Sequence, residues 1–158
     1  MEKELEFYKK YHNNNINKWI HFFCIPMIIL SIILLLNNFY ITYESATKKK
    51  MYKTKISSAI ILFYIISYLS LSLNIGLIMI LYFIIIKSLS TFIINNYNYY
   101  LISKYLFICG WLFQFIGHYI EGQKPALIDS ISQAFYQAPL FSLDVIYPQL
   151  FYYLKNNI

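Results

Sequence analysis

The chain has 158 residues, of which 59% are hydrophobic, 20% are aromatic and only 13% are charged. This composition excludes an ordinary soluble domain and is typical of an integral membrane protein. The formal net charge of +6 comes entirely from lysine, because the sequence contains no arginine. Lysine-rich loops beside a bilayer explain that excess more simply than nucleic acid, whose recognition usually recruits arginine, so we expect no nucleic-acid partner.

Residues 1–19 form a polar amino-terminal arm. The arm carries three glutamates among its lysines, and the apolar stretch after it is too long for a signal-peptide core, so we expect no cleaved signal. The first candidate span is 20–43, since a transmembrane helix needs about 20 mostly apolar residues to cross about 30 Å of hydrocarbon. Pro26 lies in the first turns of this span, where a missing backbone N–H is tolerated and marks a helix start.

A lysine-rich loop at 48–55 separates the first span from an apolar run at 56–94. The run is about twice as long as one crossing requires, so it must fold back on itself. Asn74 and Gly76 near its middle are typical turn residues. The sequence therefore predicts a helical hairpin with spans at 56–73 and 76–94.

A fourth span is predicted at 101–120, and Gly122 and Pro125 indicate a helix end after it. The tail at 134–154 is only moderately apolar. We expect it to be an interfacial or re-entrant segment, with a fifth span as the open alternative. The predicted fold is thus all-α: a single integral membrane domain over 1–158, a polytopic membrane helical bundle of about four transmembrane helices plus this C-terminal segment.

The chain has three histidines, at the two ends of the predicted bundle sequence. His12 and His21 flank the start of the first span, and His118 lies near the end of the fourth. Four crossings return a chain to the side of the membrane on which it began. The arm and the stretch 111–127 therefore share one membrane face, where all three histidines can meet.

The spacing of these histidines is compatible with one shared site. His12 and His21 would lie on roughly opposite faces of one continuous helix at about 100° per residue, but a break at 13–15 removes that obstacle. His118 and Glu121 are three residues apart and share a helix face. Imidazoles with a carboxylate suit a mononuclear Fe, Mn or Zn site. From the residues alone, a metal site and a purely structural role for the histidines both stay open.

Two blocks of the sequence resemble the signature blocks of the membrane 2-hydroxy fatty acid dioxygenase family, which acts in fatty acid α-oxidation and phytosphingosine breakdown. Both blocks also stand in the family's order and in the same positions relative to the spans. The matching positions of the first block are Tyr8, His12, Asn17, His21 and Pro26, and those of the second are Trp111, Gln114, Phe115, Gly117, His118, Glu121, Pro125, Ala126 and Leu127.

The resemblance implies an Fe(II)-dependent dioxygenase, a multi-pass protein of the endoplasmic reticulum membrane. Such an enzyme uses O2 to convert a 2-hydroxy long-chain fatty acid to the fatty acid one carbon shorter plus CO2. The implied Fe²⁺ ligands are His12, His21 and His118, with Glu121 either a fourth ligand or a group that fixes an imidazole. The implied roles of the remaining residues are substrate or oxygen binding by Gln114, support of the ligands by Tyr8 and Asn17, and pairing with the substrate carboxylate by Lys124.

Two other classes of protein stay open at this point. One is a non-enzymatic lipid-binding or structural helical bundle, in which the histidines only satisfy one another, Asn17 is a helix cap and Lys124 is a solvated interfacial charge. The other is a zinc-dependent lipid hydrolase. The metal content of the purified protein and the oxygen dependence of its reaction distinguish these classes from the dioxygenase.

Overall fold

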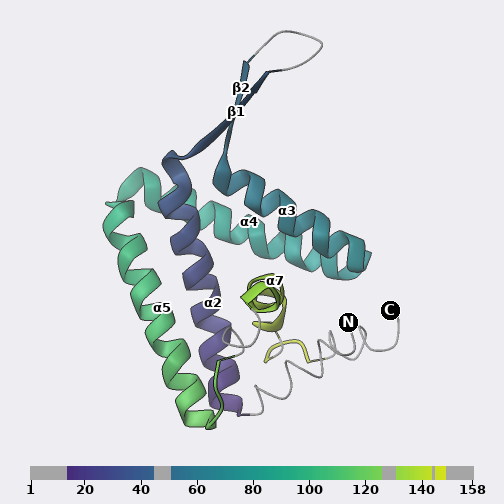
Figure 1. Ribbon diagram of the computed structural model, residues 1–158, viewed down its shortest axis with the longest axis vertical. Helices are drawn as coiled ribbons and strands as arrows, with labels where there is room; N and C mark the ends of the chain where they lie inside the picture. The colour runs from purple at the N-terminus through teal and green to yellow at the C-terminus, as the bar shows by residue number, and fades with distance from the viewer. Residues whose placement is uncertain (1–13, 45–50, 126–130, 144, 149–158) are drawn as a thin grey trace. The chain divides into compact units, whose positions relative to one another are not determined.

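The computed structural model describes residues 14–44, 51–125, 131–143 and 145–148. This part of the chain contains five α-helices, one 3₁₀ turn and one two-stranded hairpin (Figure 1). The predicted helical membrane fold is confirmed, whereas the hairpin was not predicted. The helices are α2 (Asn15–Leu35), α3 (Ile56–Leu71), α4 (Leu73–Asn96), α5 (Tyr99–Glu121) and α7 (Ile131–Phe141).

Three of these helices are long and apolar enough to cross a membrane: α2 with its 3₁₀ extension, α4 and α5. Helix α3 has 16 residues and is about 24 Å long at 1.5 Å per residue, which is less than the roughly 30 Å of hydrocarbon. The crossing predicted at 56–73 is therefore shorter than a full span. Helix α7 has 11 residues and is too short to cross, and the end of the predicted segment 134–154 lies outside the described residues.

The start of α2 differs from the prediction. The helix begins at Asn15, and the side-chain oxygen of Asn14 caps it by accepting the N–H of Ile16 at 2.8 Å. Pro26 therefore lies inside the helix, and its assignment to the helix start was wrong. Because proline has no N–H, the carbonyl of Phe22 loses its usual donor, an interruption that neighbouring helices make tolerable in membrane helices.

The end of the first predicted span is also different, because a hairpin replaces it. Strands β1 (Tyr40–Glu44) and β2 (Met51–Lys55) pair antiparallel, whereas we had predicted helix up to residue 43 and a loop at 48–55. Tyr43 stacks on Tyr52 across the hairpin at 5.6 Å between ring centroids. Tyrosine, isoleucine and threonine favour strands, yet aromatic and aliphatic residues also suit a membrane helix, which explains the error.

The α3–α4 turn lies at Ser72, a single extended residue, rather than at Asn74 and Gly76. Both predicted turn residues lie within α4. A Cβ atom on Gly76 would overlap the end of the Leu69 side chain and would be 2.7 Å from Leu69 Cγ and 2.9 Å from Leu69 Cα. Glycine is thus required there for close helix packing and not for the turn.

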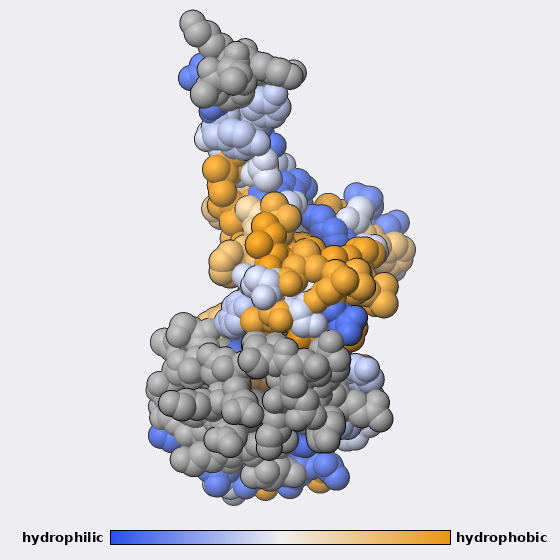
Figure 2. Space-filling view, turned by 90° about the vertical axis from the view of Figure 1, so that its right-hand side faces the viewer, coloured by the Kyte–Doolittle hydropathy of each residue, from blue (hydrophilic) through white to orange (hydrophobic). Residues whose placement is uncertain are grey.

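The chain forms two compact units: a first unit of Met1–Ile29 with Tyr105–Ile158, and a second unit of Leu30–Lys104. In the second unit, α3 and α4 pack against each other, and Tyr64 of α3 stacks on Phe83 of α4 at 5.5 Å. Figure 2 shows hydrophobic residues gathered on this helix pair and hydrophilic residues on the strands above it. Outward side chains such as Phe63 are exposed, as expected for a helix surface that faces lipid.

Candidate active site

In the first unit, the beginning of α2 packs antiparallel against the end of α5 (Figure 1). Two glycines of α5 make the approach possible. A Cβ on Gly117 would overlap the side chain of Asn17, and a Cβ on Gly110 would be 2.7 Å from the Ile28 side chain. Small residues at the interface are the usual means by which membrane helices pack closely.

Gly122 ends α5 in a Schellman motif. Its φ of 71° lies in the left-handed region that favours glycine. The N–H of Gly122 donates to the carbonyl of Tyr119 at 3.1 Å, and that of Gln123 donates to His118 at 3.2 Å. The helix therefore stops at Glu121, so that this carboxylate lies beside the first turn of α2.

Glu121 is hydrogen-bonded to the beginning of α2 through both carboxylate oxygens. One oxygen accepts the backbone N–H of Asn14 at 2.7 Å, and the other accepts the side-chain amide of Asn17. The positive end of the α2 dipole favours a carboxylate at this position. Glu121 thereby links the end of α5 to the start of α2.

His21 is buried and has a defined tautomer. Its Nδ1 lies 2.9 Å from the backbone carbonyl oxygen of Asn17, one turn earlier in α2. Because a carbonyl oxygen can only accept, Nδ1 is the donor of this hydrogen bond, and a neutral His21 ring has its lone pair on Nε2. A hydrogen bond from Nδ1 to a backbone carbonyl is a common way in which proteins orient a histidine that binds a metal through Nε2.

His118 lies next to His21. The two ring centroids are 5.0 Å apart, the ring planes are nearly perpendicular at 87°, and each side chain is only 5% exposed. The structure thus brings together two of the three predicted ligands. His12 and Tyr8 lie outside the described residues. Among the residues that are described, no group of three or more His, Cys, Asp or Glu side chains is arranged to hold a metal ion.

The structure also describes three other predicted site residues, on α5, on α2 and just after α5. Gln114 is buried, one turn before His118 on the same face of α5. Asn17 is completely buried, and Asn14 rather than Asn17 caps α2. Lys124 is exposed, just beyond the Schellman motif.

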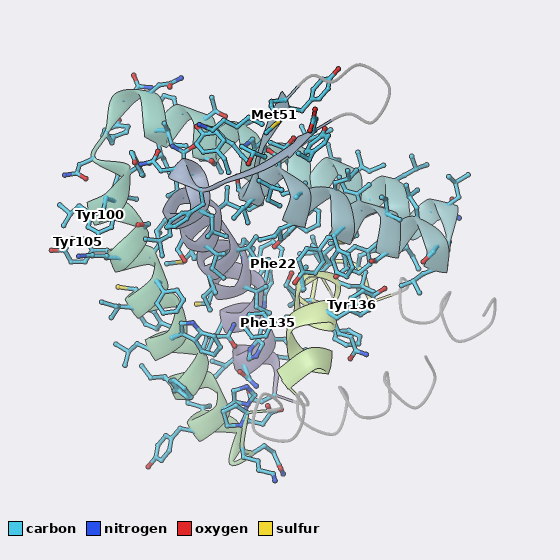
Figure 3. The ribbon with its side chains drawn as sticks, turned by 45° about the horizontal axis from the view of Figure 1, so that its top comes forward. Phe22, Met51, Tyr100, Tyr105, Phe135 and Tyr136 are labelled. Carbon is cyan, nitrogen blue, oxygen red and sulfur yellow. The ribbon has the colours of Figure 1, made fainter. Side chains whose placement is uncertain are left out.

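Trp111 is one of the positions that match the family's second block, but the sequence analysis gave it no role. Its indole Nε1 is buried and has no hydrogen-bond partner within the described part of the chain. The spacing of Trp111, Gln114 and His118 places all three on one helical face, a signal that was present in the sequence. Figure 3 shows Tyr105 pointing away from α5, and this side chain is 62% exposed.

Gln137 of α7 is a further buried polar residue, and the sequence analysis gave it no role. Helix α7 lies beside α2 in both ribbon views, and Figure 3 shows Phe22 of α2 and Phe135 of α7 on neighbouring sides of the two helices. The end of α7 is well packed, since Pro139, Leu140 and Phe141 are buried. A buried amide among these side chains adds polarity to the first unit.

The fold and this site define a membrane-helix protein that buries a pair of imidazoles where the start of one helix meets the end of another. The sequence model of the family described as "2-hydroxy-palmitic acid dioxygenase Mpo1-like" matches residues 1–150. The chain is also 32% identical over 144 residues to the 2-hydroxy-palmitic acid dioxygenase MPO1 of Saccharomyces cerevisiae, an alignment that covers 89% of this chain and 76% of the yeast protein. The chain therefore belongs to the Mpo1-like 2-hydroxy-palmitic acid dioxygenase family, and the resemblance found in the sequence is confirmed. No solved structure matches the chain.

Proposed function

We propose that this protein is an Fe(II)-dependent dioxygenase that converts a 2-hydroxy long-chain fatty acid to the fatty acid one carbon shorter plus CO2. The observation that carries the proposal is the buried pair of His21 and His118, with the proton of His21 fixed on Nδ1. The family membership supports the class of substrate and the use of O2, since the yeast relative is named for 2-hydroxy-palmitic acid.

The proposed reaction is balanced without a further reductant. RCH(OH)COOH and O2 give RCOOH, CO2 and H2O. The carbon that bears the hydroxyl becomes the new carboxyl carbon, and the old carboxyl carbon leaves as CO2. The substrate supplies all the electrons that O2 takes up, so neither 2-oxoglutarate nor a reductase partner is required.

The described histidines fit two ligands of such an iron centre. His21 offers Nε2, and the Asn17 carbonyl holds its ring in one orientation. His118 presents a second imidazole, and we propose His12 as the third. Fe(II), when bound by these residues, supplies the O2 chemistry that amino-acid side chains lack.

We propose that Glu121 holds Asn17, and through Asn17 the ring of His21, rather than serving as a fourth ligand. Both of its oxygens already accept hydrogen bonds from the beginning of α2, which supports this choice between the two predicted roles. A group that fixes a ligand in this way often matters nearly as much as the ligand itself.

Gln114 and Trp111 are proposed to donate hydrogen bonds to the substrate head. Both lie on the His118 face of α5. The buried indole N–H of Trp111 has no partner among the described residues, and such a donor costs about 1–3 kcal/mol in an apolar environment. The carboxylate and hydroxyl of a 2-hydroxy acid supply acceptors, while the acyl chain remains in the apolar surroundings. Lys124, exposed beyond α5, is proposed to attract the carboxylate as it approaches.

The test is an assay of the purified protein with 2-hydroxypalmitate and Fe(II), in air and without oxygen. We expect pentadecanoic acid and CO2 only in air, and no product from His21→Ala or His118→Ala. Protein loaded with Zn²⁺ serves as the control for an oxygen-independent hydrolase. Consumption of the substrate without O2, or an active His118→Ala variant, would show that the proposal is wrong.

We also propose that the protein resides in the endoplasmic reticulum membrane. The family resemblance supports this location, and the three helices that are long and apolar enough to cross a membrane support a multi-pass topology. A fluorescent fusion should colocalise with a reticulum marker and stay in the membrane fraction after alkaline washing. Release by that wash would contradict the membrane assignment.

A further inference from the structure

The second unit contains a polar cluster where β2 ends and α3 begins, and none of its members belongs to the histidine site. Lys55, the last residue of β2, donates from Nζ to the side-chain oxygen of Asn37 at 2.6 Å. Asn37 is buried, and the N–H of Ile56 donates to the carbonyl of Phe39 at 3.0 Å. The ammonium group of Lys55 is thus held against the base of the hairpin.

Two buried serines lie at the same end of the α3–α4 pair. Tyr64 stacks on Phe83 across the antiparallel helices. Ser57 precedes Tyr64 by two turns of α3, and Ser90 follows Phe83 by two turns of α4, so both serines lie at one level of the seam. Both are at most 1% exposed, and within the described part of the chain neither hydroxyl has a hydrogen-bond partner.

Two lysines lie close in sequence to these serines. Lys87 lies one turn before Ser90 in the otherwise apolar helix α4, and Lys55 precedes Ser57 by two residues. No ion pair joins either lysine to an acidic residue among the described residues. In the sequence of the whole second unit, seven lysines stand against a single acidic residue, Glu44. A lysine at membrane depth usually has a partner, and Glu44 is the one acidic side chain in the sequence of this unit.

The beginning of α3 adds further donors. Its N-cap residue is Lys55, and no side chain caps the first turn. The N–H groups of that turn and the positive end of the helix dipole therefore favour an anion at this point. An anion is the kind of ligand that suits all of these groups: two ammonium groups, two buried hydroxyls and an uncapped helix start.

We propose that Lys55, Lys87, Ser57 and Ser90 bind an oxyanion at the start of α3, and that this oxyanion is the phosphate headgroup of an anionic membrane lipid. A lipid is favoured over free phosphate because α3 exposes apolar side chains such as Leu62 and Phe63 along the helix that leads away from the cluster, where acyl chains would lie. Serines and lysines donate to phosphate oxygens, with lysine acting as a point charge. The site does not depend on the proposed dioxygenase reaction.

The experiment compares the full chain in nanodiscs of phosphatidylcholine alone with nanodiscs that also contain phosphatidic acid. We expect phosphatidic acid to raise the unfolding temperature of the wild type and to remain bound in native mass spectrometry. The double variant Lys55→Gln/Lys87→Gln should bind this lipid about tenfold more weakly. The matched control is Lys104→Gln, which removes the same charge from an exposed lysine whose ammonium group lies 4.3 Å from the centre of the Tyr100 ring.

Three results would overturn the proposal: no stabilisation of the wild type by phosphatidic acid, equal weakening by Lys104→Gln, or equal stabilisation by inorganic phosphate in phosphatidylcholine nanodiscs. If the lysine variants do not fold, Ser57→Ala/Ser90→Ala provides a second test, because alanine keeps the close packing of the helices. This variant should unfold at the wild-type temperature in phosphatidylcholine but lose the bound phosphatidic acid. Full retention of the lipid would mean that the serines serve only to pack the helices.

Discussion

Asn17 connects His21 to Glu121 through two different groups. Its backbone carbonyl accepts the proton of His21 Nδ1, and its side-chain amide donates to Glu121. The residue is completely buried, and Gly117 of α5 leaves the space that its side-chain oxygen fills. The orientation of one imidazole therefore depends on a glycine and a carboxylate of the neighbouring helix.

Exchanging donor and acceptor between Asn17 and Glu121 tests this link. Asn17→Asp removes the amide donor and brings two carboxylates together, so we expect a loss of about 1–3 kcal/mol in stability together with lower iron content. Glu121→Gln added to Asn17→Asp restores a donor opposite an acceptor and should recover much of both losses. Thermal unfolding and metal analysis of the four proteins give the coupling between the two residues. Additive losses in the double variant would show that the hydrogen bond does not matter.

Gly117→Ala and Gly110→Ala separate helix packing from the site. Each new Cβ meets a side chain of α2: that of Asn17 for Gly117, and that of Ile28 for Gly110. Overpacking of this kind typically costs about 1–3 kcal/mol, so we expect both variants to unfold at lower temperature. Only Gly117→Ala displaces Asn17, and it should therefore lose far more dioxygenase activity for the same loss in stability. Equal losses of activity would mean that Asn17 does not position His21.

The helical hairpin of α3 and α4 is held by close packing next to its turn. Gly76→Ala pushes a methyl group against the backbone of Leu69 and should destabilise the hairpin by about 1–3 kcal/mol. Ser72→Ala is the matched control, because the extended backbone of Ser72 accepts any residue and should change the unfolding temperature little. Thermal unfolding in detergent measures both variants. A larger fall in unfolding temperature for Ser72→Ala than for Gly76→Ala would show that Ser72, rather than Gly76, stabilises the hairpin.

Length and hydropathy indicate where membrane helices lie, because hydrocarbon demands about 20 apolar residues in succession. They are less informative about where a helix ends. The sequence around Tyr40 is apolar enough for a helix, and only the cross-strand pairing with β2 selects the strand. Pro26 was taken for a helix start because a missing N–H is tolerated in the first turns of a helix, although Asn14 caps α2 well before the proline.

The histidines of the site could be identified from the sequence, because an ionisable group in an apolar run is conspicuous. The meeting of His21 and His118 agrees with the parity of the crossings, whereas their role as ligands stays a prediction. The partners of Glu121 were not predictable, because one of them is the backbone N–H of Asn14. Gln137 was missed because an amide in a moderately polar tail carries no such signal, and only packing reveals its burial.

The antiparallel packing of α2 and α5 restricts the topology of the whole chain. If α2 leaves one side of the membrane, α5 returns to that side, and the chain between them must cross an even number of times. Helices α3 and α4 therefore either both cross the membrane, or they enter it together and return to the same side. The choice depends on whether the 16 residues of α3 can cross. The prediction that the histidines share one membrane face is compatible with both arrangements.

This topology predicts which positions share a side of the membrane. In a background of Cys24→Ala and Cys109→Ala, we expect Ile16→Cys and Gln123→Cys to react with a membrane-impermeant maleimide from the same side of sealed vesicles. Both positions are exposed, at the start of α2 and beyond the end of α5. Thr42→Cys, which follows the other end of α2, should react only from the opposite side. Labelling of all three from one side would show that α2 does not cross.

Removal of the metal should affect both the activity and the stability of the protein, because an ion held by His21 and His118 binds only the folded chain. We expect a chelator to abolish O2 consumption with 2-hydroxypalmitate and to lower the unfolding temperature. Fe(II) added back at about 100 times its dissociation constant should restore about 2.7 kcal/mol of stability. His21→Ala, His118→Ala and His12→Ala should each lose this iron-dependent stabilisation, which is measured by thermal unfolding without any substrate. A wild-type response to Fe(II) in one of these variants would remove that histidine from the ligand set, and a response in all three would contradict the iron site.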